Sequence, residues 1–368
     1  MYDQIIDKNN PDSALKVTKG VENPISINQN YLKNVRKRQE LTVDDYVKGI
    51  LEGNRTILAR AITLVESNLY KHQALAQQVI ERCLPHSGGS VRLGITGVPG
   101  VGKSTTIESL GKMLTNQGHK VAVLAIDPSS ERSGGSILGD KTRMELLASD
   151  PNAFIRPSPS AGSLGGVARK TREIIILCEA AGFDVVIIET VGVGQSEVLA
   201  HSMVDFFLLL QLANAGDELQ GIKRGIMEMA DAIAINKCEG KEKERGELAA
   251  SNYRNALHLF PPTESGWKPK VFTCSAYENN GIDTIWKTVM EYVDMTKKTG
   301  YFYQNRNTQN LRILSESINQ ALRDNFYQRE IIKEKLELAK DDILDNKISA
   351  YIIAQRLIDE YFESLKTK

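Results

Sequence analysis

The middle of the chain alternates short apolar segments with longer segments in which apolar residues recur at helical spacing. Short apolar runs are typical of buried parallel strands, because helices cover both faces of such a sheet. The alternation therefore predicts an α/β fold, with a mostly parallel central sheet flanked by helices over residues 91–297. The predicted strands cover residues 91–96, 121–126, 185–189, 206–212, 232–236 and 271–275.

The part of the chain that precedes this region has a different pattern. Residues 1–41 are polar and aperiodic, which predicts a loosely ordered leader. In residues 42–90, Thr42 and Asp45 have the spacing of a capping box, and apolar residues follow at helical intervals. We therefore expect an N-terminal helical region over residues 42–90.

Residues 298–368 have a helical pattern to the end, with many charges between the apolar positions. Leu311, Leu314, Ile318 and Leu322 follow one another at intervals of three or four residues, which places them on one helix face. The pattern predicts two or three extended helices in a C-terminal arm. This arm could pair with a second copy to form a homodimer, or it could pack back on its own domain.

Composition narrows the classes of partner and location. Lys and Arg together number 46, and Asp and Glu together also number 46, so no net positive field favours nucleic acid or an anionic membrane. The longest apolar stretch is too short to cross a bilayer, and the N-terminus lacks the features of a targeting segment. Cysteines occur singly, which argues against a disulfide framework and favours the cytoplasm; they are Cys83, Cys178, Cys238 and Cys274.

The first candidate site is a phosphate-binding loop between the first predicted strand and its helix. Residues 97–104 read GVPGVGKS, and this motif binds nucleoside triphosphates through backbone amides at the start of a helix. Lys103 would reach the terminal phosphates, and Ser104 would offer magnesium a hydroxyl. The candidate nucleotide-binding residues here are Gly97, Pro99, Gly100, Val101, Gly102, Lys103, Ser104 and Thr105.

Acidic residues follow two further predicted strands. Asp127 ends one strand and opens a loop rich in glycine and serine, which carries a second carboxylate at Asp140. Glu189 ends another strand, and Gly192 lies three residues later, where its amide could contact the terminal phosphate. Such residues could hold magnesium and sense whether the terminal phosphate is present.

The base would be bound by two segments that follow later strands. Asn236-Lys237-Cys238-Glu239 resembles the guanine-reading NKxD motif of GTPases, with Glu239 at the carboxylate position. A carboxylate there accepts hydrogen bonds from guanine, whereas adenine presents an acceptor, so the motif favours GTP over ATP. Residues 274–276 resemble the supporting SA loop. The candidate base-binding residues are Asn236, Lys237, Glu239, Ser275, Ala276 and Tyr277.

Taken together, these motifs resemble the MeaB/ArgK/MMAA family of P-loop GTPases over residues 42–300. The matching segments read GVPGVGKST, AIDPSSERSGGSILGDKTRM, ETVGVGQSE, ANAGDELQGIKRG, NKCE and TCSA. The resemblance implies a homodimeric metallochaperone for adenosylcobalamin-dependent acyl-CoA mutases such as methylmalonyl-CoA mutase. Such a protein couples the hydrolysis of GTP to GDP and phosphate to cofactor loading and protection.

The resemblance also implies roles for single residues. Ser104, Asp127, Asp140 and Glu189 would form the magnesium shell, directly or through water. Lys223 would neutralise transition-state charge once a partner orders its loop. The residues implied in catalysis are thus Lys103, Asp127, Glu189 and Lys223. Residues 127–143, 189–197 and 214–223 would be three switches, the last of which contains Asp217, Gln220 and Lys223.

Two alternatives remain open from sequence. A small-molecule kinase or transport-linked ATPase would need a pocket for a phosphate acceptor. A nickel-insertion GTPase typically has histidine-rich or paired-cysteine metal sites, whereas the histidines and cysteines here occur singly. The sequence carries no readable code for the client mutase.

Overall fold

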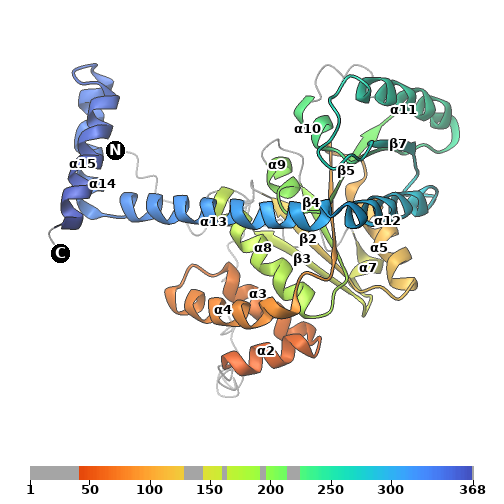
Figure 1. Ribbon diagram of the computed structural model, residues 1–368, viewed down its shortest axis with the longest axis horizontal. Helices are drawn as coiled ribbons and strands as arrows, with labels where there is room; N and C mark the ends of the chain where they lie inside the picture. Colours follow the sequence, from red (N-terminus) through yellow and green to blue (C-terminus); the bar gives the residue numbers. More distant parts are fainter. Residues whose placement is uncertain (1–40, 128–143, 160–163, 191–195, 214–223, 367–368) are drawn as a thin grey trace, which may run out of the picture. The chain divides into compact units, whose positions relative to one another are not determined.

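The computed structural model describes residues 41–127, 144–159, 164–190, 196–213 and 224–366, and all described elements belong to one compact unit, Thr42–Lys368 (Figure 1). The predicted leader lies outside these residues, apart from Leu41. A seven-stranded sheet has the order β3-β2-β4-β1-β5-β6-β7, and all its neighbouring strands pair in parallel. The predicted α/β fold is confirmed. The strands are β1 (Val91–Gly97), β2 (Val121–Asp127), β3 (Ala153–Pro159), β4 (Val185–Thr190), β5 (Phe206–Leu212), β6 (Ala232–Asn236) and β7 (Lys270–Thr273).

Six of the seven strands match predicted segments, and the sequence analysis missed β3. This strand reads AFIRPSP, and its two prolines and its arginine break the apolar pattern. Proline lacks the backbone N–H that a central strand needs, but it is tolerated at a sheet edge. β3 lies at the edge and pairs on one side only, with β2. Its edge position therefore explains how a proline-containing segment forms a strand.

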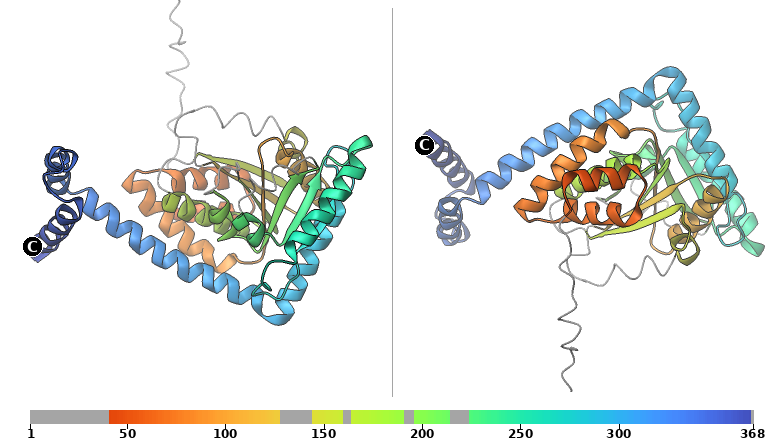
Figure 2. Two further views of the ribbon diagram at one scale, coloured as in Figure 1. Left: turned by 90° about the horizontal axis from the view of Figure 1, so that it is seen from above. Right: turned by 90° about the horizontal axis from the view of Figure 1, so that it is seen from below.

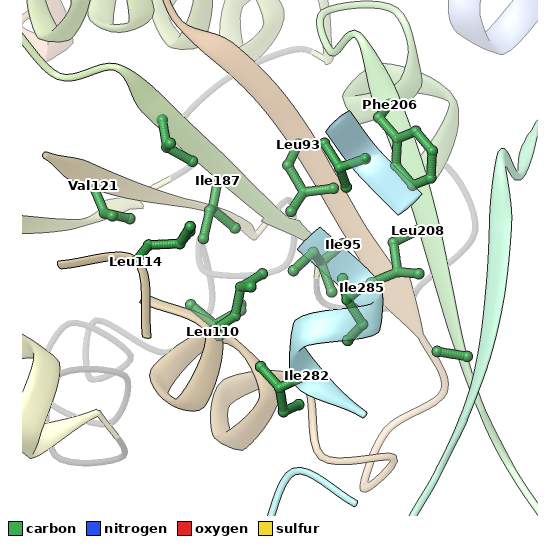
Figure 3. Close-up of a cluster of buried hydrophobic side chains, with 14 of the residues drawn as sticks. Leu93, Ile95, Leu110, Leu114, Val121, Ile187, Phe206, Leu208, Ile282 and Ile285 are labelled. Atoms are coloured by element: carbon green, nitrogen blue, oxygen red, sulfur yellow. The ribbon is translucent and has the colours of Figure 1, made fainter. Parts of the chain in front are cut away.

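Helices cover both faces of the sheet. One face is packed by α5 (Lys103–Asn116), α7 (Glu145–Ala148) and α12 (Ile282–Thr299). The other face is packed by α8 (Leu164–Ala180), α9 (Ser196–His201), α10 (Arg224–Met229) and α11 (Lys243–Leu257). Figure 3 shows the core under α5 and α12, where Leu93, Ile95, Leu110, Phe206 and Ile285 are at most 1% exposed. Apolar side chains alternate between the two faces along each strand, as a doubly covered sheet requires.

The predicted N-terminal helices are present as α2 (Val43–Leu51), α3 (Arg55–Glu66) and α4 (Tyr70–Cys83), followed by a short 3-10 turn, η1 (Leu84–His86). The Thr42 side chain accepts a hydrogen bond from the Asp45 amide, and the Asp45 carboxylate accepts one from the Thr42 amide. The predicted capping box is therefore confirmed. α3 and α4 pack on α8, where the Lys170 ammonium donates to the Glu66 carbonyl oxygen at 2.8 Å.

The C-terminal part forms three helices, as predicted: α13 (Tyr301–Tyr327), α14 (Glu330–Leu344) and α15 (Ala350–Lys366). Figures 1 and 2 show α13 as a long helix that runs from α12 past α8 to the α14–α15 pair. Ile332, Leu357 and Tyr361 form a small buried cluster within that pair. The division into separate regions at residues 90 and 297 stays a prediction.

Two further observations bear on location. No helix in the described part of the chain is long and apolar enough to cross a membrane. The thiols of Cys83, Cys178, Cys238 and Cys274 are free and buried. The cytoplasmic location stays a prediction.

Candidate nucleotide site

The predicted phosphate loop connects the carboxyl end of β1 to the amino end of α5, at the centre of the sheet. Two of its glycines are required by their surroundings. Gly102 has a φ of 98°, and a Cβ atom there would lie 2.6 Å from Asn236 Nδ2. At Gly97, whose φ is 152°, a Cβ atom would lie 2.5 Å from the Leu210 carbonyl oxygen. The loop therefore depends on residues without a side chain at both positions.

Lys103 is the first residue of α5, and its ammonium folds back onto the loop. Nζ donates to the carbonyl oxygens of Gly97 at 2.8 Å and Val98 at 3.2 Å. Burial lowers the pKa of Lys103, while the charges of Glu189 and Glu197 act to raise it. The loop thus holds a cation where the motif predicts contact with the terminal phosphates.

The predicted magnesium ligands are only partly described. Ser104 lies half-buried in the first turn of α5, and Glu189, 9% exposed, lies in β4, in register with Ile95 of β1. Asp127 is the last residue of β2, and its side chain is not among the described ones. Asp140, Gly192, Asp217, Gln220 and Lys223 lie outside the described residues. The structure therefore brings Ser104, Glu189 and the end of β2 to the carboxyl edge of the sheet. Ligands of parallel α/β sheets bind at this edge.

Glu197 is the last residue of the predicted second switch, and the sequence analysis gave it no individual role. It lies in the first turn of α9, is 2% exposed, and its charge acts on the Lys103 ammonium. Ser196 Oγ lies 3.3 Å from its Oε2 atom. A buried carboxylate requires partners, and the Ser196 hydroxyl supplies one. The available signal was a Ser-Glu pair at the end of the predicted second switch, where a helix begins.

Asn236 joins the phosphate loop to both base-binding segments. Its Nδ2 atom donates to the Val101 carbonyl oxygen at 2.8 Å, in the phosphate loop. Its Oδ1 atom accepts from the Ala276 amide at 3.0 Å and from the Cys274 thiol at 3.6 Å. Ser109 of α5 also donates to the Ala276 carbonyl oxygen, at 2.8 Å. The three predicted segments thus meet through one buried amide side chain.

The remaining base-site residues surround this junction. Lys237 has a left-handed backbone, with φ of 62°, and its side chain is exposed. Within the described part of the chain, the buried Oε2 atom of Glu239 has no hydrogen-bond partner. Ser275 is buried and accepts from the Glu278 amide, whereas Tyr277 is 84% exposed. An unpaired buried carboxylate oxygen fits the donors on the edge of a guanine.

The arrangement offers a phosphate cradle, a cation and an acceptor for a base along one edge of the sheet. Among the residues that the structure describes, no group of three or more His, Cys, Asp or Glu side chains is placed to hold a metal.

Comparison with known proteins places these features in a family. A family model described as "Methylmalonyl Co-A mutase-associated GTPase MeaB" matches residues 58–330. A probable GTPase of Mycobacterium tuberculosis is 47% identical over 318 residues, which cover 86% of this chain and 95% of the relative. GTPase ArgK of Escherichia coli is 43% identical over 328 residues, which cover 88% and 99%.

Two further similarities agree with this match. The mitochondrial methylmalonic aciduria type A homolog of Mus musculus is 41% identical over 343 residues, which cover 90% of this chain and 83% of the relative. A solved structure titled LAO/AO transport system kinase has a TM-score of 0.70 and 37% identity, and the match covers 87% of this chain and 97% of that one. The predicted family is confirmed, and with it the predicted GTPase activity. The chain belongs to the MeaB family of methylmalonyl Co-A mutase-associated GTPases.

Proposed function

We propose that this GTPase is a metallochaperone that assists cofactor loading and protection of an adenosylcobalamin-dependent acyl-CoA mutase, such as methylmalonyl-CoA mutase. The observation that carries the proposal is the family match over residues 58–330, because the family is described as mutase-associated. The name of the mouse relative, a methylmalonic aciduria type A homolog, also supports it. The nucleotide would act as a switch, since a ligand that binds two conformations unequally shifts their populations.

In this proposal the phosphate loop changes partners when GTP binds. The Lys103 ammonium leaves the Gly97 and Val98 carbonyl oxygens and bonds to the terminal phosphates. Water then attacks the terminal phosphate, and GDP and inorganic phosphate leave. Lys223 supplies a further positive charge when the mutase is bound, so the mutase accelerates hydrolysis.

Magnesium fits the donors at this edge. A serine hydroxyl and carboxylate oxygens are its preferred protein ligands, and Ser104 and Glu189 provide one of each. With Asp127 and Asp140 they would hold the ion directly or through water. Bound there, magnesium would neutralise phosphate charge.

The direct test uses the full chain and purified methylmalonyl-CoA mutase. Phosphate release from GTP is measured with and without the mutase, together with retention of adenosylcobalamin by the mutase. We expect faster hydrolysis with the mutase, and nucleotide-dependent retention of the cofactor. The chaperone role is wrong if the mutase does not change the rate of GTP hydrolysis and also does not bind this chain in the presence of a non-hydrolysable GTP analogue.

A kinase function is the alternative that one comparison favours, because the similar solved structure is titled a transport system kinase. A kinase transfers the terminal phosphate to an acceptor, whereas a GTPase transfers it to water. GTP labelled in its terminal phosphate separates the two functions. Label on a small molecule or on a transport protein, rather than in inorganic phosphate, would support the kinase.

We expect Glu239→Ala to weaken the preference for guanine nucleotides. The unpaired buried oxygen of Glu239 is the proposed acceptor for the guanine edge, so its removal costs GTP binding and leaves ATP binding unchanged. Two lost hydrogen bonds to a charged acceptor correspond to roughly 10²-fold in affinity. Calorimetric titration with GDP and with ADP measures the ratio of the two affinities. Glu244→Ala, on the exposed surface of α11, is the control. A wild-type protein that uses GTP and ATP equally well would contradict this role.

We also propose that the chain forms a homodimer through α13. Four apolar side chains lie at intervals of three or four residues on this helix, and each is more than half exposed: Leu311 at 68%, Leu314 at 58%, Ile318 at 51% and Leu322 at 59%. A monomer surface rarely exposes such a continuous apolar stripe. A second copy of the same helix offers a matching stripe for self-complementary packing.

This proposal predicts that Leu314→Glu with Ile318→Glu yields a monomer. Charged side chains at the centre of an apolar interface lose their hydration, which costs several kcal/mol. Light scattering after size-exclusion chromatography measures the mass. The control pair, Asn310→Glu with Asn319→Glu, adds the same two charges at exposed positions that border the stripe, where the charges keep more of their hydration than at its centre. A dimer of unchanged stability in the Leu314 and Ile318 double variant would place the interface elsewhere.

A further inference from the structure

Arg172, on α8, is a buried cation whose hydrogen-bonding capacity is only partly used. Its side chain is 9% exposed, and Nη2 donates to the Ser202 carbonyl oxygen at 2.8 Å and to Ser202 Oγ at 2.9 Å. Within the described part of the chain, its buried Nε and Nη1 atoms have no hydrogen-bond partner. Buried polar atoms are almost always paired, and an unpaired donor on a charged group is especially costly. Arg172 therefore presents donors that the fold itself does not use.

The Glu316 carboxylate, on α13, faces Arg172 without pairing fully with it. Its Oε2 atom lies 3.7 Å from Arg172 Nη1, which is longer than a hydrogen bond, and its side chain is 42% exposed. Burial lowers the pKa of Arg172 to about 10; the charge of Glu316 opposes this shift, whereas those of Arg312 and Arg92 add to it. At neutral pH the guanidinium keeps its charge, and one loosely placed carboxylate faces it.

Arg172 lines a pocket of about 570 Å³ between the N-terminal helices, α8 and α13, where α13 runs past α8 (Figure 1). The two other cations on its wall also belong to α8, and both have partners. Arg169 Nε donates to Glu173 Oε1 at 2.9 Å. Lys170 Nζ donates to the Glu66 carbonyl oxygen at 2.8 Å. The volume lies in the range of small-molecule sites, and none of the described residues on the wall belongs to the candidate nucleotide site.

The rest of the wall fits a polar molecule. Glu316 lines it, together with the Ser317 hydroxyl and five side-chain amides, those of Asn68, Gln73, Gln77, Gln320 and Gln328. Amides and hydroxyls both donate and accept hydrogen bonds, so they suit the hydroxyl and carbonyl groups of a polar metabolite. Such a molecule must bring negative charge, because the donors without partners belong to a cation.

We propose that this pocket binds a small polar metabolite through a carboxylate or phosphate group that accepts hydrogen bonds from Arg172. The oxyanion replaces Glu316 beside the guanidinium, and the Glu316 side chain turns into solvent. Carboxylate and phosphate groups match the planar donors of a guanidinium and form its strongest hydrogen bonds. The site depends neither on GTP hydrolysis nor on the proposed mutase, so either can fail without the other.

Two probes, malonate and inorganic phosphate, represent the two kinds of oxyanion. Each is added to the full chain saturated with GDP, so that the nucleotide site is occupied, and chloride at equal ionic strength is the reference. The ¹⁵N NMR signal of Arg172 Nε, assigned by its loss in Arg172→Lys, reports contact at that atom. We expect at least one probe to shift this signal with saturation at millimolar concentration. No saturable shift with either probe up to about 50 mM would overturn the proposal.

Glu316→Gln tests the predicted competition for Arg172. The substitution removes a negative charge from a half-exposed position, so we expect the probe to bind about fivefold more tightly than to the wild type. The matched control is Glu334→Gln, on the exposed surface of α14 and outside the pocket, which should leave the affinity unchanged. If Glu316→Gln binds no more tightly than the wild type, Glu316 does not hold the place of an anion and the proposal is wrong.

Arg172→Met tests whether the guanidinium is required. This variant also loses the bonds to Ser202, so thermal unfolding without a probe first checks that it folds. A bound probe raises the unfolding temperature, and we expect a smaller rise in Arg172→Met than in Arg323→Met, which alters an exposed arginine of α13 outside the pocket. Equal rises would contradict the proposal. So would an Arg172 signal in the wild type that changes with protein concentration but with neither probe, because a second copy would then fill the pocket.

Discussion

Lys103→Ala is expected to abolish measurable GTP hydrolysis while the protein stays folded. The substitution removes the cation that the phosphate loop holds within hydrogen-bond distance of its own carbonyl oxygens. Loss of a preorganised charge at a transferring phosphate costs about 10²- to 10³-fold or more in rate. Alanine favours the first turn of α5, and Gly97 and Val98 keep their carbonyl oxygens available to water. Phosphate release and thermal unfolding, measured on the same sample, separate activity from stability.

The control for this prediction is Lys243→Ala. Lys243 is likewise the first residue of a helix, α11, but it is exposed and has no part in the proposed site. Its removal is expected to leave hydrolysis within about twofold of the wild type, as for most surface substitutions. Normal turnover in Lys103→Ala would mean that the phosphate-loop assignment is wrong.

Asn236→Ala is expected to weaken guanine-nucleotide binding and also to destabilise the protein without nucleotide. The substitution leaves the Val101 carbonyl oxygen and the Ala276 amide without their partner inside the fold. Each buried group left unpaired costs about 1–3 kcal/mol, so for the two groups we expect a loss of roughly 2–6 kcal/mol in the free energy of unfolding. Because three loops lose a common contact, binding of GDP should fall by on the order of 10²-fold.

Asn236→Asp provides the matched comparison. An aspartate keeps the acceptor for the Ala276 amide but replaces the donor to the Val101 carbonyl oxygen with a second oxygen. We expect the phosphate loop to be disturbed more than residues 274–276 in this variant. Urea unfolding and GDP titration measure the two effects. Equal stability of Asn236→Ala and the wild type would sink the idea that this side chain organises the site.

The predictable parts of the site are those encoded by adjacent residues. The phosphate loop and its flanking strand and helix occupy one continuous segment, so spacing alone identified them. Apolar runs identified six strands, whereas β3 was missed because its arginine and prolines break the apolar run, and prolines are acceptable in a strand only at a sheet edge. Local patterns thus predicted most of the strands and helices. The position of β3 at the sheet edge could not be predicted from a local pattern, because it depends on how all the strands assemble.

The parts that sequence reasoning missed are pairings between residues far apart in the chain. Arg306 and Asp205 are 101 positions apart, and Asn236 and Val101 are 135 apart. No periodicity marks such pairs, since each depends on how the whole chain folds. Glu197 was not singled out within the predicted second switch, because an acidic residue in a first helical turn is ordinary until its burial is known.

Pro157 and Pro159 have a consequence for self-association. They occupy alternate positions on the outermost strand, so the side of β3 that faces away from β2 is short of N–H donors at these positions. An extended segment from another molecule finds too few donors there to add itself as an eighth strand. The two prolines therefore protect the outer side of β3 against strand pairing with another molecule at concentrations where sheets with unprotected edges aggregate.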